Sequence, residues 1–227
     1  MGGSIAVAIR FSNGETVCFE RWTNTMSAWF LNERWLQEDR NYILEYVSAV
    51  KNNWDPKTKT WDGYGKPLPL KRSGYGIVIW DFLTHHMIEE NDYTSFNRIH
   101  SISLANSIED DDQERVEGIK SLADAGRLFK NEIIYNTRSK KHTKRDTPST
   151  WDEILQDYQD YQASNYESKR QTSVMYDIDV SPFTYVDLEK DKSKSLNQWL
   201  VDLEWPRTQK QELNRFYKNL IANNFQL

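Results

Sequence analysis

The chain has 227 residues, of which 38% are hydrophobic and 13% aromatic, and its formal net charge at pH 7 is −5. This charge excludes an overall cationic field that would draw the protein to nucleic acid or anionic membranes, so a nucleic-acid site has to be a local patch. Cys18 is the single cysteine, which excludes an intrachain disulfide and a cysteine-based zinc site and is typical of a reducing compartment. We see neither a signal peptide nor an apolar run of transmembrane length, and we expect a cytoplasmic protein without membrane contact.

The first predicted element is a β-hairpin. Apolar residues alternate over 5–11 and again over 16–22, with the turn-forming residues Ser12-Asn13-Gly14 between the two runs. A three-residue loop with its glycine in the left-handed region places Ile9 opposite Val17. A two-residue turn instead places apolar residues opposite charged ones, so apolar pairing favours the longer loop.

The reverse face of this hairpin carries the small residues Ala6, Ala8 and Cys18, and we expect a helix to sit close to it. Residues 27–54 follow the helical spacing of apolar residues, and Asp39 is a candidate N-cap within this range.

The middle of the chain is predicted to alternate between loop, strand and helix. Residues 55–73 hold three prolines and two glycines and form a long loop. A second hairpin runs from 75–80 to 86–88, and 99–104 adds a strand. The acidic stretch 109–112 then leads into a helical pattern that reaches about Phe129.

Residues 136–149 carry five cations and no large apolar side chain, so we expect a basic linker or mobile loop there. It separates an α+β domain over 1–135, which begins with the β-hairpin, from a mostly helical region over 150–227 that could pack on the first as one domain. Thr150 and Glu153 form a capping box at the start of this region.

Within 150–227, residues 174–188 are predicted to be extended, and 195–204 and 208–223 to be helices. The predicted fold class is therefore α+β, with a mainly antiparallel sheet of N-terminal hairpins packed with helices and a helical C-terminal region.

No phosphate-binding loop and no serine-hydrolase elbow occurs in the sequence, and whether the protein is an enzyme stays open. Nine Trp, twelve Tyr and nine Phe are its most unusual feature. Aromatic residues on loops stack on ligands or anchor protein interfaces, although filling a core that is poor in Leu and Val explains the same surplus.

The leading interpretation is a non-enzymatic binding protein that engages a host protein or a small anionic ligand such as a nucleotide, with no cofactor expected. Exposed aromatic residues would also suit a homodimer. The candidate ligand-binding residues are Arg10, Arg21, Trp54, Trp61 and Tyr64.

One alternative is an enzyme that acts on a phosphodiester or nucleotide with Mg²⁺ or Mn²⁺. Asp177 and Asp179 share one face of a predicted strand, and Asp81 follows an apolar strand directly. Paired carboxylates bind these metals, and His85 and His86 are further candidate ligands. A solvent-facing strand edge and exposed turn residues explain the same pattern.

A second alternative is a nucleic-acid-binding protein. The basic run within 136–149 would contact phosphates as a flexible arm, and the last two helices would form a helix-turn-helix. Pro206 between those helices and the apolar stripe of the last one equally suit an ordinary helical hairpin. The candidate nucleic-acid residues are Arg138, Lys140, Lys141, Lys144, Arg145, Lys210 and Arg215.

The opening segment, from Met1-Gly2-Gly3 to Arg21-Trp22-Thr23-Asn24, resembles uncharacterised small proteins of tailed bacteriophages and prophages, as does the stretch from Tyr75 to Ser95. The resemblance implies an accessory protein of a phage or mobile element that acts in the host bacterial cytoplasm. It covers about the first hundred residues and implies no particular activity.

A looser match is to ADP-ribosyltransferases, which use a strand arginine, a Ser-Thr-Ser strand and a later glutamate. Arg10, Thr94-Ser95-Phe96 and Glu109 or Glu117 occur in this order, but Tyr93 stands where the first serine belongs.

Overall fold

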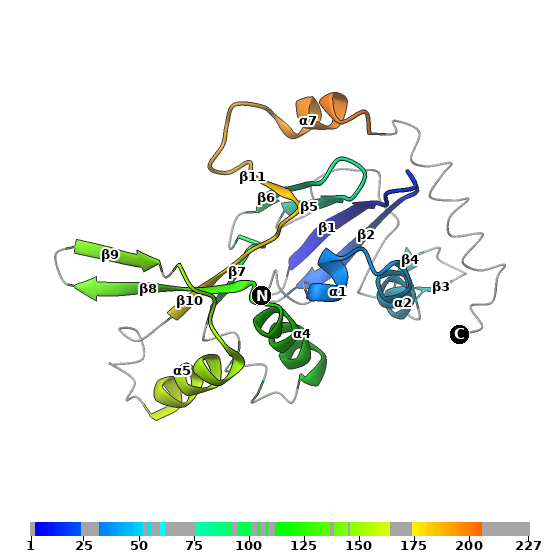
Figure 1. Cartoon of the computed structure of the whole chain (residues 1–227). Helices are drawn as coiled ribbons and strands as arrows, with labels where there is room; N and C mark the ends of the chain where they lie inside the picture. The colour runs from blue at the N-terminus through cyan, green and yellow to red at the C-terminus, as the bar shows by residue number, and fades with distance from the viewer. Residues whose placement is uncertain are drawn as a thin grey trace. The chain divides into compact units, whose positions relative to one another are not determined.

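The computed structural model describes residues 3–23, 32–51, 54–55, 60–61, 76–91, 95–100, 104, 108, 112–136, 139–144, 146–163 and 174–205. By its internal contacts the chain forms two units, and Figure 1 labels their helices and strands. Unit 1 comprises Met1–Thr25, Glu38–Ser95 and Pro182–Leu227, and unit 2 comprises Met26–Gln37 and Phe96–Ser181. Each unit has its own β-sheet and its own helices, which confirms the predicted α+β class.

Unit 1 is built on a five-stranded sheet of order β11-β6-β5-β1-β2. Its strands are β1 (Gly3–Arg10), β2 (Thr16–Thr23), β5 (Gly76–Asp81), β6 (His86–Asn91) and β11 (Thr184–Asp187). Pairing is antiparallel within the two predicted hairpins but parallel between β1 and β5 and between β6 and β11. Parallel neighbours need a long crossover, and the one from β6 to β11 contains most of unit 2.

The first hairpin has the predicted register. Phe11 N donates to Glu15 O over 2.8 Å and closes a three-residue loop, in which Gly14 has φ +83°. Ile9 pairs with Val17, as apolar matching requires.

A helix covers the small-residue face of this hairpin, as predicted. It is α7 (Leu196–Asp202), capped at its start by Ser195. The buried cluster beneath it consists of Ala6, Ala8, Cys18, Ile77, Ile79, Ile88, Val186, Leu188 and Trp205. Leu196, Trp199, Leu200 and Leu203 pack against this cluster from α7 and the residue after it. The α7 side chains therefore supply the bulk that the small sheet residues leave out.

The end of α7 turns the chain back to the sheet. Glu204 has φ +53°, its N donates to Val201 O over 3.0 Å, and Trp205 N donates to Leu200 O over 2.8 Å. These two bonds form a Schellman motif, which satisfies carbonyls of the last helical turn. Trp205 consequently returns to the cluster, where it is buried.

Aromatic residues fill much of the described core. Trp35 and Trp80 are fully buried, and the Trp80 ring meets Phe183 edge to face with centroids 5.3 Å apart. Core filling thus explains these tryptophans and Trp205.

Unit 2 has a four-stranded sheet of order β7-β10-β8-β9. Its strands are β7 (Arg98–His100), β8 (Leu128–Asn136), β9 (Ser139–Lys144) and β10 (Val174–Ile178). The helices described in full are α1 (Glu33–Leu36), α4 (Gln113–Asp124) and α5 (Trp151–Ala163). The capping box of α5 is present, since Glu153 N donates to Thr150 Oγ1 over 3.3 Å and Thr150 N to Glu153 Oε2 over 3.0 Å.

The structure corrects the predicted linker over 136–149, because Ser139–Lys144 forms strand β9 and pairs with β8. The predicted division at this segment also differs from the observed units, since β8, β9 and β10 belong to one sheet. Region 150–227 contains β10 and β11 as well as α5 and α7.

Two predicted helices have different bounds. The range 27–54 contains α1 and α2 (Arg40–Lys51), which are separated at Glu38 with φ +54°. Asp39 is the predicted N-cap, because its Oδ1 accepts from Tyr42 N over 3.1 Å. The helix expected to reach Phe129 ends at Asp124, where Gly126 with φ +69° reverses the chain.

The remaining predictions for this region concern loops and the chain's end. Part of the loop expected over 55–73 pairs as strands β3 (Trp54–Asp55) and β4 (Thr60–Trp61). The helix predicted over 208–223 lies outside the described residues. Among those residues, no helix has both the length and the hydropathy needed to cross a bilayer.

The packing of α7 on the sheet predicts that Cys18 is unreactive. Its side chain is buried in the cluster, and burial raises the pKa of the thiol to about 12. We expect 5,5′-dithiobis(2-nitrobenzoate) at pH 8 to label native protein at least about 100-fold more slowly than protein unfolded in urea.

The same shift predicts a loss of stability in alkali. Burial favours the neutral thiol in the folded state. The free energy of unfolding is therefore unaffected by the Cys18 thiol below about pH 8.5 and falls as the pH rises towards 12.

In the labelling experiment, a native rate equal to that of the unfolded chain would show that α7 does not protect this face.

Candidate functional site

One end of the unit 1 sheet carries a row of polar residues, one from each strand. In the register of the sheet, Arg10 pairs with Thr16 and Asp81, Asp81 with His86, and His86 with Thr184. We call these five residues the polar row. Each stands two positions from a member of the α7-covered cluster on its own strand, so the polar row lies on the α7 face.

Asp81 and Arg10 form a buried ion pair at the centre of the polar row. Their relative exposures are 0% and 4%. Arg10 Nε donates to Asp81 Oδ1 over 2.9 Å, and Arg10 Nη2 donates to Oδ2. Asp81 also accepts from Trp205 Nε1 over 3.1 Å and from Thr84 N over 3.1 Å. Four donors thus stabilise this carboxylate without solvent.

The guanidinium of Arg10 continues this network to the end of α7. Its Nη1 donates to Glu204 O over 3.2 Å, and its central carbon lies 5.1 Å from the centroid of the Trp205 ring. Cation–π contacts of this kind are strongest when they are desolvated. The ion pair therefore anchors the segment after α7 to the sheet. The side chains of Arg10 and Asp81 bond partners inside the protein.

The two histidines occupy different settings. His86 Nδ1 lies 2.8 Å from Thr84 O, and because a carbonyl only accepts, we assign the ring proton to Nδ1. The ring lies 5.7 Å from that of Trp199. His85 is exposed in the turn, with φ +53°, and its ring lies 6.1 Å from that of Phe183. The two rings thus have different neighbours.

Only one of the two carboxylates predicted to share a strand face lies in a strand. Asp177 lies in β10 and accepts from Arg98 Nε over 2.9 Å and from Asn131 Nδ2 over 3.2 Å. Asp179 lies beyond the end of β10, and its Oδ1 accepts from Ser181 N and Oγ over 3.0 and 2.6 Å. Within the described part of the chain, no group of three His, Cys, Asp or Glu residues is placed to hold a metal ion.

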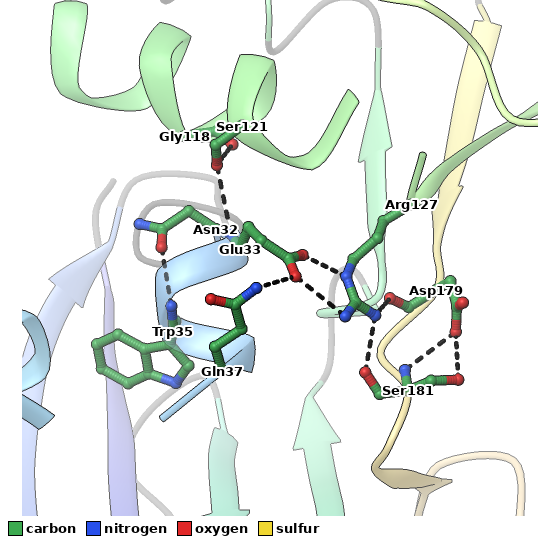
Figure 2. Close-up of polar contacts among 9 residues, drawn as sticks. All are labelled: Asn32, Glu33, Trp35, Gln37, Gly118, Ser121, Arg127, Asp179 and Ser181. Atoms are coloured by element: carbon green, nitrogen blue, oxygen red, sulfur yellow. Dashed lines mark hydrogen bonds and ion pairs between the residues drawn. The ribbon is translucent and has the colours of Figure 1, made fainter. Parts of the chain in front are cut away.

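A second polar cluster lies in unit 2 around Arg127 (Figure 2). Its guanidinium binds Glu33 through two bonds, Nε to Oε2 and Nη2 to Oε1, the latter 3.1 Å long. Nη1 donates to the carbonyls of Asp179 and Ser181 over 3.2 and 2.7 Å. Arg127 therefore ties α1 to the turn that follows β10.

The same cluster fixes the start of α1. Asn32 caps the helix, because its Oδ1 accepts from Trp35 N over 2.9 Å. Glu33 N donates to Ser121 Oγ of α4 over 3.3 Å, and Gln37 Nε2 donates to Glu33 Oε1 over 2.9 Å (Figure 2). A four-residue helix has few bonds of its own, so these contacts determine its position.

The other candidate ligand residues are placed only in part. Arg21 lies in β2, and Trp54 and Trp61 pair across β3 and β4, while Tyr64 lies outside the described residues. Of the candidate nucleic-acid residues, three lie in β9: Lys140, Lys141 and Lys144. Arg138, Arg145, Lys210 and Arg215 lie outside the described residues, as do Thr94 and Glu109 of the ADP-ribosyltransferase pattern.

The sequence did not predict the network around Asp81. The sequence held a signal for the Arg10–Asp81 pair. Each of these residues ends an apolar strand and continues the alternation of its inward-facing positions. No local signal connects either residue to Trp205 or Glu204. Likewise nothing in the sequence paired Arg127 with Glu33, 94 residues away.

Comparison with known protein families, with curated proteins and with solved structures found no match to the chain. The protein is therefore classed by its own geometry. It is an α+β protein of two units, each with a buried or half-buried ion pair that joins segments far apart in the sequence.

The buried pair of unit 1 predicts non-additive mutations. Arg10→Met leaves the Asp81 carboxylate buried without its charged partner, and we expect a loss of about 3–5 kcal/mol in the free energy of unfolding. Asp81→Leu should cost a similar amount. The double variant should lose less than the sum, with a coupling of up to about 3 kcal/mol. Urea unfolding followed by circular dichroism measures each value, and additive losses would contradict the coupling.

The unit 2 cluster predicts a contrast between two Arg→Lys variants. Arg127→Lys cannot bond both Glu33 oxygens and both carbonyls, so we expect a loss of about 2 kcal/mol. The control is Arg98→Lys, since Arg98 is 38% exposed and its pair with Asp177 should contribute less than about 1 kcal/mol. Equal losses in urea unfolding would show that the cluster is no stronger than a surface ion pair.

Proposed function

We propose that the protein is a non-enzymatic binding protein. The observation that carries this proposal is the engagement of the three acids that a metal-dependent enzyme would use. Asp81 accepts from Arg10, Trp205 and Thr84, Asp177 from Arg98 and Asn131, and Asp179 from Ser181. Asp81 accepts two donors at each of its oxygens, so it has to give up some of these bonds before it can bind a metal.

The energetics of Asp81 argue most strongly for a structural role. It is fully buried and belongs to the network that holds Trp205 and the end of α7. Withdrawing it for catalysis would leave the Arg10 guanidinium buried without its partner, at a cost of about 3–5 kcal/mol. This supports the proposal that Asp81 stabilises unit 1 rather than performing chemistry.

The partner class stays a prediction. A host protein or a small anionic ligand such as a nucleotide is the leading choice, and the role of a phage accessory factor rests on the resemblance of the N-terminal segment. The candidate ligand residue Arg10 is engaged by Asp81, so a ligand site would use other cations.

Two measurements test this function. The first is turnover of bis(p-nitrophenyl) phosphate, ATP and GTP with Mg²⁺ or Mn²⁺, for the wild type and for Asp177→Asn/Asp179→Asn. The second is calorimetric titration of both proteins with ATP and GTP. We expect no metal-dependent turnover, and any saturable nucleotide binding should be the same in both proteins, because these acids bind internal donors.

Asp177 and Asp179 are chosen because they are less buried than Asp81, so the variant should stay folded. A melting-temperature scan of both proteins with Mg²⁺, Mn²⁺ and EDTA is the control, and no metal should stabilise either. Turnover that requires metal and disappears in the variant would reject the proposal in favour of the metal enzyme.

A further inference from the structure

In the described part of the chain, the β8–β9 hairpin extends beyond the pairing of β8 with β10. Strand β10 pairs with Leu128–Glu132 of β8, whereas Ile133–Asn136 pairs, within the described part of the chain, with β9 alone (Figure 1). The register runs from Asn131 opposite Lys144 to Asn136 opposite Ser139. We call these paired residues, 131–136 and 139–144, the ribbon. Its outer part is two-stranded in the described residues.

The charge of the ribbon is opposite to that of the chain. No Asp or Glu occurs over 133–145, and Lys140, Lys141 and Lys144 lie in β9 together with His142, although the protein as a whole has a net charge of −5. Because the chain as a whole is negative, a nucleic-acid site in this protein has to be a local group of cations. The ribbon is such a group.

Protection of an edge strand is the competing explanation. Strand β9 is at the edge of its sheet, and lysines on edge strands hinder pairing with other chains. Charge of either sign has this effect, however, so edge protection does not explain why thirteen consecutive residues, 133–145, lack any acid. Attraction to a polyanion explains both the lysines and the missing acids.

The shape of the ribbon selects among polyanions. A two-stranded β-ribbon fits the major groove of B-form DNA, which is about 12 Å wide. The major groove of duplex RNA is too deep and narrow to be read in this way. Six residues of β9 span about 20 Å at 3.3 Å per residue, which is comparable with half a helical turn of DNA.

We propose that the ribbon binds duplex DNA in the major groove, and that the positive charge of β9 supplies the attraction to the phosphates. This inference rests on the proposed function as a binding protein and names its partner. It replaces a flexible basic arm with an ordered two-stranded element, and it does not require the helices predicted at the chain's end.

The experiment measures the affinity of the full chain for a fluorescent 20-base-pair duplex by anisotropy between 50 and 200 mM NaCl. Three phosphate contacts give a slope of about −2.7 in log K against log salt, or about 40-fold weaker binding over this range. Lys140→Gln/Lys141→Gln/Lys144→Gln should weaken binding at 50 mM by at least tenfold and remove about 2.7 units of slope.

The matched control is Lys190→Gln/Lys192→Gln/Lys194→Gln, which removes the same charge from exposed positions of unit 1. These lysines pair with Asp187, Glu189 and Asp202, respectively, so neighbouring acids offset them. We expect this variant to keep the wild-type affinity and slope within about twofold. Equal losses of affinity in both variants would show that net charge alone explains the effect, and would overturn the proposal.

A third variant, Lys140→Arg/Lys141→Arg/Lys144→Arg, keeps the charge of β9 and should bind like the wild type. This Arg variant decides the matter if the Gln variant aggregates through its edge strand, because loss of binding in a folded Arg variant would overturn the proposal. Absent or salt-independent binding of the wild type would also overturn it, as would a duplex RNA bound as tightly as the DNA.

Failure here and failure of the proposed function are distinguishable. Absent DNA binding without metal-dependent turnover leaves a binding protein with another partner. Metal-dependent cleavage of the duplex that is lost in Asp177→Asn/Asp179→Asn would reject the proposed function, while the β9 variants would still report whether the ribbon holds the DNA.

Discussion

Asp81 has no exposed surface, and a carboxylate in that position is stable only because four donors replace the water it loses. The donors come from the end of β1, from the turn after β5 and from Trp205, the last residue of the Schellman motif that ends α7. One side chain thus holds together three parts of unit 1, the farthest of them 124 residues from Asp81 in the sequence. The covering of the small-residue face by α7 depends on this network, since the helix has only seven residues.

The two parallel pairings explain why the units are interleaved. A hairpin needs only a tight turn, whereas β11 can align in parallel with β6 only after a long excursion of the chain. The chain uses that excursion to build most of unit 2, including a complete four-stranded sheet. Each unit therefore closes through contacts between distant segments, which is a topology that slows folding.

The sequence predicted what neighbouring residues determine. Apolar matching gave the register of Ile9 with Val17, and the Thr150–Glu153 capping box marked the start of α5, because these contacts span a few residues. Strand β9 was missed because an edge strand can form without buried apolar residues. Its sequence has no alternation of apolar and polar residues that would predict a strand. The Arg10–Asp81 pair spans 71 residues, and only the alignment of the two hairpins brings the partners together.

Two kinds of charge follow from this architecture. Arg10, Asp81, Glu33 and Arg127 are matched within the protein, so they stabilise the fold and contribute little to long-range attraction. The cations of β9 have no acid within their own hairpin beyond Glu132. In the field of a polyanion, a chain with net charge −5 is repelled except where such cations gather. On the proposal that the ribbon binds DNA, the surplus of acid works with the ribbon, because it disfavours every orientation on DNA other than the one that presents β9.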